Sequence, residues 1–177
     1  MKLPKIAIVT VSDRASAGIY EDLSGPAVLD WLKTVIATPF ELVCRLIPDG
    51  SGSVSATLIE LSDVEACDLI LVTGGTGPAL RDQTPEGLAL VAERMLPGFG
   101  ETMRRANLAE VPTAILSRQD AATRGRSLII TLPGKPAAIA TSLNSIFAAV
   151  PYCLDLIGAA QLCTNPDVMP SFRPLTH

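Results

Sequence analysis

Apolar residues along this chain recur with two different spacings, and the two spacings alternate from one end of the chain to the other. Short apolar or alternating runs predict strands over residues 5–12, 40–46, 69–73 and 127–132. Between these runs, apolar residues recur every three or four positions, which indicates amphipathic helices. Strands that alternate with helices predict an α/β fold of three layers, in which a mostly parallel central sheet carries helices on both faces.

Glycine and proline residues mark where the predicted elements begin and end. Ser24-Gly25-Pro26 has the form of a helix start, and Pro48-Asp49-Gly50 separates the second strand from a second helix. A third helix is predicted after Pro85, with Leu88, Val91, Ala92 and Met95 on one face, and it should end at Pro97-Gly98. Further predicted elements are a helix over residues 99–109, a strand over residues 113–117, and helices after Pro136 and Pro151.

The composition supports one domain and argues against one class of partner. With 177 residues and no linker rich in Gly, Ser or Pro, we expect a single domain over residues 1–177. Apolar residues make up 48% of the chain and aromatic residues only 4%, so the core must consist of aliphatic side chains, as in buried parallel strands. The net charge of −4 argues against a sequence-independent nucleic-acid binder, which needs a basic surface.

The cysteines and the first residues predict a cytoplasmic protein. The four cysteines are scattered without a CxxC pair, which indicates neither a zinc site nor a disulfide framework. The chain begins without the pattern of a secretory signal. The segment 136–154 carries no formal charge but contains Pro151, Asn144 and several hydroxyl residues, so we interpret it as a buried helix in the core or at a subunit interface and expect no membrane partner.

Polar residues gather where the predicted strands end. They follow strands at Asp13-Arg14, Asp49-Gly50, residues 74–82, residues 118–120 and residues 133–136. Because the carboxyl ends of parallel strands meet at one edge of a sheet, where ligands bind, we expect these residues to lie close together. Each alone could be a simple turn or helix cap, whereas the five together favour a site for a phosphorylated ligand.

The loop richest in glycine is Thr73-Gly74-Gly75-Thr76-Gly77. Three glycines in five residues permit positive φ angles and let the main chain approach a ligand closely. The loop fits neither of two common phosphate motifs, because a Walker loop needs Gly-Lys-Ser/Thr where residues 79–81 stand and a dinucleotide fingerprint needs glycine at Leu80. A second loop, residues 132–136, joins a strand to a helix, so its N–H groups and Lys135 can face an anion.

The lack of an internal histidine limits the chemistry. The only histidine is His177 at the end of the chain, so neither a Ser-His-Asp triad, a Cys-His pair nor a histidine-bound metal is indicated. Carboxylates, cations, hydroxyls and backbone amides suit phosphoryl or nucleotidyl transfer with Mg²⁺. Asp49 and Asp82 are the leading carboxylates for Mg²⁺, because each follows a predicted strand and has a glycine or proline nearby.

Seven short motifs in a fixed order carry a family resemblance. They are Val11-Ser12-Asp13-Arg14, Ile47-Pro48-Asp49, residues 73–78, Arg81-Asp82-Gln83-Thr84-Pro85-Glu86, Pro97-Gly98-Phe99-Gly100-Glu101, Ile115-Leu116-Ser117-Arg118 and Leu132-Pro133-Gly134-Lys135-Pro136. With this ordered set the chain resembles the MogA-type molybdopterin adenylyltransferases of the MogA/MoaB family over nearly its whole length.

The resemblance implies an α/β fold, a trimeric assembly and a step in molybdenum cofactor biosynthesis. In that step the terminal phosphate of molybdopterin attacks the α-phosphorus of ATP with Mg²⁺ present, which gives adenylylated molybdopterin and pyrophosphate. The attacking phosphate is already an anion, so no strong protein base is needed, in agreement with the lack of an internal histidine. Other proteins of molybdenum cofactor biosynthesis are further implied partners.

The resemblance also implies roles for individual residues. Asp49 and Asp82 match the essential acidic pair, as catalytic residues and Mg²⁺ ligands. The nucleotide loop is matched by Gly74, Gly75, Thr76, Gly77, Thr84 and Pro85, and the rim that contacts the nucleotide or the pterin phosphate is matched by Ser117, Arg118, Pro133, Gly134 and Lys135. Ser12 and Asp13 match the edge of the first strand. Glu86 stands where aspartate is common in the family, which shifts its oxygens by one bond length.

The sequence leaves other functions open. A related module that binds molybdopterin without adenylylating it carries similar loops, usually within a larger chain. A non-catalytic scaffold does not need two acidic groups that face anions, and a flavodoxin-like flavin binder needs a hydroxyl-rich phosphate loop. The connection between Pro136 and Ile146 is shorter than in some members of the family, which should alter only a peripheral loop.

Overall fold

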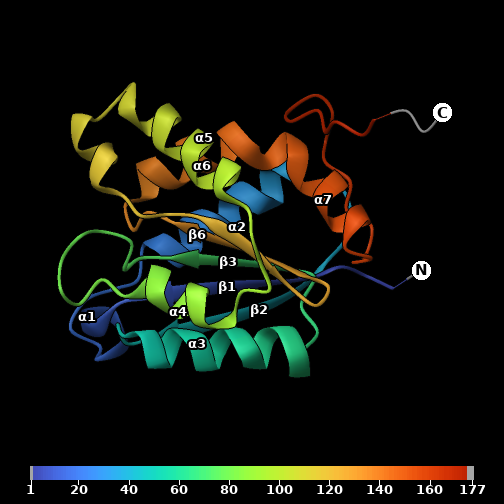
Figure 1. The fold of residues 1–177 in the computed structure, drawn as a ribbon. Helices are drawn as coiled ribbons and strands as arrows, with labels where there is room; N and C mark the ends of the chain where they lie inside the picture. The colour runs from blue at the N-terminus through green and yellow to red at the C-terminus, as the bar shows by residue number, and fades with distance from the viewer. Residues whose placement is uncertain (1, 175–177) are drawn as a thin grey trace.

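Four parallel strands form one side and the centre of a six-stranded sheet, and two antiparallel pairings extend its other side (Figure 1). The order across the sheet is β2-β1-β3-β6-β5-β4. The parallel strands are β1 (Lys5–Val11), β2 (Glu41–Ile47), β3 (Leu69–Thr73) and β6 (Ser127–Leu132), followed by β5 (Ala121–Arg124) and β4 (Arg94–Met95). The computed structural model describes residues 2–174.

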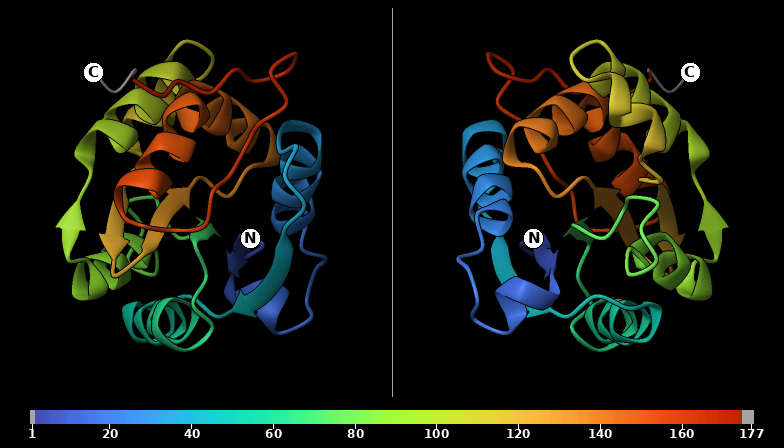
Figure 2. Two further views of the ribbon diagram at one scale, coloured as in Figure 1. Left: turned by 90° about the vertical axis from the view of Figure 1, so that its right-hand side faces the viewer. Right: turned by 90° about the vertical axis from the view of Figure 1, so that its left-hand side faces the viewer.

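Helices cover both faces of this sheet. One layer contains α2 (Ser24–Val35), α5 (Pro97–Leu108), α6 (Pro136–Ile146) and α7 (Val150–Leu156), and the other contains α3 (Ser51–Ile59), its π-helical extension (Glu60–Val64) and α4 (Thr84–Val91). Figure 2 shows α3 and α4 together below the sheet from both sides. Along β1, Ile6 and Ile8 pack with the first layer, whereas Ala7 and Val9 pack with the second. The prediction of a three-layer α/β fold is confirmed.

The helix after Pro85 is shorter than predicted. α4 ends at Val91, and Met95 lies in strand β4, where it pairs with Ala122. Pro97 does not end that helix but stands in the first turn of α5, a position at which the missing N–H of proline is not needed. The predicted end was wrong because proline marks the starts of helices as well as their ends. The helix predicted over residues 99–109 is present as α5.

The strand predicted over residues 113–117 was also wrong. Pro112–Leu116 forms a 3₁₀ helix in which no residue is buried, so its apolar residues do not face the core. The sheet instead uses β5, which pairs antiparallel with β6. Because β5 runs in the opposite direction, its amino end lies at the carboxyl edge of β6. Residues 118–120 therefore reach the expected edge of the sheet, but they precede a strand instead of following one.

The uncharged segment near the C-terminus is helical and packs into the core. Pro136–Leu156 is long and apolar enough, by length and composition alone, to cross a membrane, with a mean hydropathy of 1.5 in a stretch that is 44% buried. A 3₁₀ turn (Phe147–Ala149) separates α6 from α7 within it. Its core-facing residues include five that are at most 1% exposed, namely Ile139, Leu143, Phe147, Val150 and Leu154. This packing agrees with the interpretation as a buried helical segment.

The chain order reverses at β1, and this reversal defines where a ligand can enter. β1 pairs with β2 on one side and with β3 on the other. In open α/β sheets, ligands bind in the crevice outside the carboxyl ends of the strands at such a point. The short helix α1 (Asp13–Ser16) and the loop after β3 lie at this edge, at the left in Figure 1.

Candidate active site

A polar cavity of about 310 Å³ opens at the carboxyl ends of β1 and β3. Its walls come from the loops that follow β1, β2 and β3, with one residue from the loop after β6. Seven of the sequence-predicted site residues line it, namely Ser12, Asp13, Asp49, Gly74, Gly75, Asp82 and Gly134. The structure thus brings the two candidate catalytic carboxylates, Asp49 and Asp82, into one cavity.

Asp13 and Asp49 hold the ends of β1 and β2 together. The main-chain N–H of Asp13 donates to Asp49 Oδ2 at 2.8 Å, and that of Asp49 donates to Asp13 Oδ1 at 3.1 Å. Ser12 adds a main-chain bond to Ile47 O at 2.9 Å, and its hydroxyl accepts from Ala15 N–H as the cap of α1. Both carboxylates are therefore oriented by main-chain donors.

The first two glycines of the loop after β3 are required by close packing. Gly74 and Gly75 have φ angles of +101° and +64°, which L side chains rarely adopt. A Cβ at Gly74 would lie 2.3 Å from Val11 O. A Cβ at Gly75 would lie 2.4 Å from Thr84 Oγ1 and 3.2 Å from Asp49 Oδ1. The fold itself requires these glycines, in addition to any close approach of a ligand.

Thr84 and Pro85 support the same loop from the start of α4. Thr84 is fully buried, its hydroxyl donates to Gly74 O at 2.8 Å, and its N–H donates to Gly75 O at 3.1 Å. Pro85 stands in the first turn of α4. Neither residue is part of the wall of the polar cavity. The structure places both behind the glycine loop.

The carboxylate of Asp82 lies close to Gly77. A Cβ at Gly77 would lie 2.6 Å from Asp82 Oδ2, so any larger residue here would require this carboxylate to move. The N–H of Ala79 donates to the same oxygen at 3.3 Å. Because this bond is long, the Asp82 carboxylate is only weakly held and can take a cation or a substrate donor.

A second cavity, of about 340 Å³, lies beside the first and has mainly apolar walls. Those walls include Val111, Leu116 and Ala138. The sequence-predicted site residues that line it are Thr76, Gly77, Ser117, Pro133, Gly134 and Lys135. Gly134 lines both cavities, so the site has a polar half that holds the carboxylates and a less polar half that suits the face of a flat ring.

Arg118 and Glu86 form an ion pair beside the two cavities. The hydrogen bond from Arg118 holds the pKa of the Glu86 carboxyl below its usual range, against the smaller opposing effect of burial. Other guanidinium donors of Arg118 reach the main-chain oxygens of Gly77 and Asp82. Both charged residues border a separate hollow together with Asp82. The structure thus gives Glu86 a partner on the protein itself.

Several residues that the sequence did not assign to the site line the polar cavity, among them Arg14, Tyr20 and Ser24, and Arg81 borders it. The Ser24 hydroxyl donates to Gly134 O at 2.6 Å, and Arg81 pairs with Asp13. The Arg14 guanidinium lies 5.3 Å from the centroid of the Tyr20 ring. In a chain with so few aromatic residues, a tyrosine in the polar segment after the first strand is a signal that could have marked this wall.

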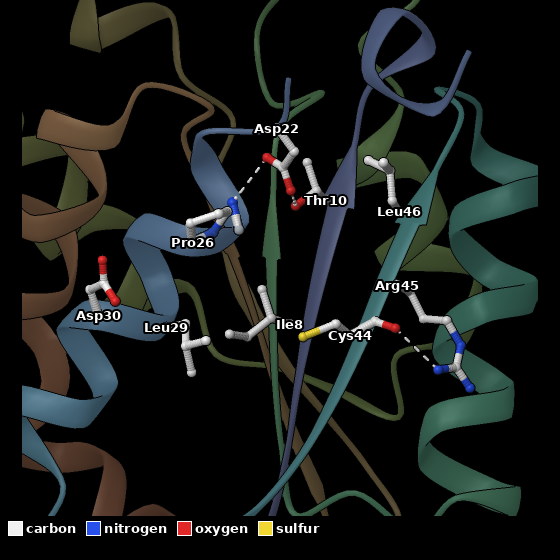
Figure 3. Close-up of a pocket in the computed structure, with 10 residues that line it drawn as sticks. Ile8, Thr10, Asp22, Pro26, Leu29, Asp30, Cys44, Arg45 and Leu46 are labelled. Carbon is white, nitrogen blue, oxygen red and sulfur yellow. Dashed lines mark hydrogen bonds between the residues drawn. The ribbon is translucent and has the colours of Figure 1, made fainter. Parts of the chain in front are cut away.

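A third cavity, of about 400 Å³, lies between α2 and β2 and contains none of the sequence-predicted site residues (Figure 3). Its walls are mainly apolar, with Leu29 and Cys44 among them. Of its two acidic residues, Asp22 and Asp30, the first is already partnered, because it accepts from the Thr10 hydroxyl at 2.7 Å and from Gly25 N–H at 3.1 Å. Asp22 therefore acts as a cap that joins the start of α2 to β1.

The donor set can be tested for the expected Mg²⁺. Among residues 2–174, no three or more His, Cys, Asp and Glu side chains gather in a way that could hold a metal ion. The polar cavity nevertheless offers the carboxylates of Asp49 and Asp82. Mg²⁺ is usually bound by one or two carboxylates together with substrate phosphates, so this pair fits the ion.

Comparison with known proteins shows the family to which the chain belongs. The family described as "Probable molybdopterin binding domain" matches residues 7–152, and the chain belongs to this family. Among its relatives, a protein of Haemophilus influenzae named molybdopterin adenylyltransferase is 50% identical, over 97% of this chain and 93% of its own length. A protein of the same name from Helicobacter pylori is 48% identical, over 98% of this chain and 99% of its own length.

Solved structures agree with this assignment. The molybdopterin biosynthesis enzyme MoaB from Thermus thermophilus matches with a TM-score of 0.80 at 38% identity, over 88% of this chain and 96% of that one. The fold and the family are therefore the ones that the sequence motifs indicated.

Proposed function

We propose that this protein is a molybdopterin adenylyltransferase, which transfers AMP from ATP to the terminal phosphate of molybdopterin and releases pyrophosphate, in molybdenum cofactor biosynthesis. One observation carries the proposal: Asp49 and Asp82 line the same cavity at the point where the strand order reverses. The names of relatives that are 50% and 48% identical over nearly the whole chain support the same activity.

The bond changes of this reaction suit the residues that line the site. An oxygen of the molybdopterin phosphate bonds to the α-phosphorus of ATP, and the bond from that phosphorus to the bridging oxygen of pyrophosphate breaks. The attacking oxygen is already anionic, so the protein has to position the reactants and balance charge, not remove a proton. The only histidine, His177, lies outside the described residues and has no part in the proposal.

We assign the phosphates to the polar cavity and the flat rings to less polar surfaces beside it. The main-chain N–H groups of residues 75–77 and the ammonium of Lys135 serve as donors to phosphate oxygens. Because Gly134 lines both cavities, the reacting phosphates meet beside it. Ser12, Asp13 and Ser117 serve as polar contacts at the rims of the two halves.

Mg²⁺ is the proposed cofactor, and Asp49 and Asp82 are its proposed ligands. When bound, the ion neutralises charge on the phosphate oxygens of ATP. The two carboxylates orient it, Asp49 from a position fixed by Asp13 N–H and Asp82 from a more mobile position over Gly77. Since only these two groups are proposed as ligands, tight binding of the ion should require ATP.

The assembly and the location of the protein are part of the proposal. We propose a single domain over residues 1–177 that forms a homotrimer in the cytoplasm and cooperates with other proteins of molybdenum cofactor biosynthesis. Light scattering after size-exclusion chromatography tests the assembly, because a trimer has three times the chain mass of 18.6 kDa. A mass equal to one chain at micromolar concentration would contradict it.

A direct assay tests the activity. Purified protein with ATP, Mg²⁺ and molybdopterin should form adenylylated molybdopterin and an equal amount of pyrophosphate. Asp82→Asn should keep the fold but lose most turnover, because removal of one electrostatic contact of this kind often costs roughly 3 to 4 kcal/mol, on the order of a hundredfold or more. Wild-type turnover in this variant would remove Asp82 from the mechanism.

The alternative function is a molybdopterin-binding module or scaffold without transferase activity. It predicts measurable binding of molybdopterin with no release of pyrophosphate from ATP. The acidic pair in one cavity favours the transferase, because the binding of an anionic ligand alone gains nothing from two carboxylates that face it. Binding without product in the assay above would favour the alternative.

A further inference from the structure

We propose that Arg118 is a positioning residue, which fixes the loop of residues 77–82 and through it the Asp82 carboxylate, and that it does not bind the substrates. The inference rests on the adenylyl transfer proposed above and assigns Arg118 a different role from the rim contact that the resemblance implies. Each of the three nitrogen atoms of this side chain donates one hydrogen bond within the protein.

Arg118 contacts the loop of residues 77–82 at both of its ends. Its Nε–H donates to Gly77 O at 3.1 Å, and an Nη2 donor reaches Asp82 O. Its main-chain N–H donates to Thr76 O at 2.8 Å. One side chain thus bonds to the main chain at the start and at the end of residues 77–82, which sets the separation between Gly77 and Asp82.

Glu86 fixes the guanidinium in this position. It accepts from Nη1 of Arg118, and it stands in the first turn of α4, so the ion pair connects the loop to a helix. A substrate phosphate that paired with Arg118 would compete with Glu86, which already accepts from Nη1. The guanidinium fork suits this bridging, because its donors point in fixed and different directions.

The Asp82 carboxylate depends on this arrangement. Its Oδ2 accepts from Ala79 N–H at the long distance of 3.3 Å, within the same loop. Because that bond moves with the loop, the position of the carboxylate relative to Asp49 is set by the main chain that Arg118 holds. Loss of the Arg118 bonds therefore changes the geometry of the acidic pair, while Asp49, fixed by Asp13 N–H, stays in place.

The first test is Arg118→Lys, which keeps the charge but not the fork. We expect kcat to fall at least tenfold, whereas the dissociation constant of molybdopterin changes less than twofold. Amide hydrogen exchange in residues 77–82 should become at least tenfold faster. This exchange measurement does not depend on turnover, so it remains informative even if the wild type proves inactive and the proposed function fails.

Glu86→Gln separates positioning from substrate binding and serves as the second variant if Arg118→Lys folds poorly. If Arg118 positions the loop, this variant lowers kcat roughly threefold to tenfold, with faster exchange over residues 77–82. If Arg118 binds a substrate phosphate, removal of the competing carboxylate instead lowers the KM for ATP or for molybdopterin. The second result would overturn the proposal.

Arg124→Lys is the matched control. Arg124 also pairs with an acidic side chain, Asp63, and donates to a main-chain oxygen, Val91 O, but it lies outside both cavities. We expect its kcat and the exchange of residues 77–82 to equal those of the wild type. Arg118→Lys with wild-type kcat and exchange, or with raised KM at unchanged kcat, would show that Arg118 does not act through the loop.

Discussion

Asp13 and Asp49 exchange hydrogen bonds, each carboxylate accepting from the main-chain N–H of the other residue, at 3.1 and 2.8 Å. The two residues follow neighbouring parallel strands, so the pair closes the carboxyl end of β1 against that of β2. This bonding occupies Oδ2 of Asp49, while its Oδ1 lies toward Gly75. One side chain thus has a structural oxygen and an oxygen that faces the glycine loop.

The different contacts of the two carboxylates predict different effects for a variant of each residue. Asp49→Asn keeps an oxygen that can accept from Asp13 N–H, so its melting temperature should stay within a few degrees of the wild type. Its turnover should fall on the order of a hundredfold, because the negative charge is lost. Asp13→Ala removes the acceptor for Asp49 N–H and should lower the free energy of unfolding by about 1 to 3 kcal/mol. Thermal unfolding measures the stability of the two variants, and the pyrophosphate assay measures their turnover. Equal loss of stability in the two variants would contradict the different roles of Asp13 and Asp49.

Gly77→Ala should separate catalysis from stability. The added Cβ would lie 2.6 Å from Asp82 Oδ2, and this atom ends a side chain that can move away. We expect the free energy of unfolding to change by less than about 1 kcal/mol, whereas turnover falls at least tenfold because the carboxylate is displaced. The control is Gly52→Ala in the first turn of α3, where a Cβ meets nothing within 4 Å. Wild-type turnover in Gly77→Ala would mean that the place of Asp82 over this glycine is irrelevant.

Gly74→Ala should behave in the opposite way. Its φ angle is +101°, and an added Cβ would lie 2.3 Å from Val11 O, a main-chain atom of β1 that cannot move without disturbing the sheet. We expect the free energy of unfolding to drop by at least about 2 kcal/mol, seen as a lower urea midpoint. A midpoint unchanged from the wild type would show that the loop after β3 can relax away from β1.

Much of the fold could be predicted from the sequence, because the residue pattern within an element is often enough to identify that element. β3 and β6 are mainly aliphatic runs whose residues are all buried, so their sequence patterns predict these strands. Met95 and residues 113–117 were assigned wrongly because a local pattern does not show pairing. Met95 is a strand residue only because Ala122 lies opposite it.

For the candidate site, too, the local sequence pattern does not show which distant residues come into contact. The positions of the glycines and of Asp49 and Asp82 could be predicted, because each follows a strand end. The contacts behind the proposed role of Arg118 could not, since its bonds to Glu86 and Gly77 join residues 32 and 41 positions away in the chain. Likewise, the need for glycine at position 74 comes from Val11 O on another strand. The sequence therefore predicted residues that the structure brings together in the polar cavity, but it did not identify which residues hold that cavity in shape.

Cys67 predicts a loss of stability at alkaline pH. It is 2% exposed, and burial raises the pKa of its thiol to about 11, whereas an unfolded chain ionises cysteine near pH 9. Between these values the unfolded state releases a proton that the folded state keeps, so the contribution of Cys67 is present below about pH 9 and is lost as the pH rises toward 11. The difference in unfolding free energy between wild type and Cys67→Ala, from urea titrations, should therefore shift against the wild type by up to about 2 kcal/mol from about pH 8 to about pH 10.5. The small cavity left by the alanine acts equally at both pH values and cancels, so a difference that is constant with pH would show that burial does not shift this thiol.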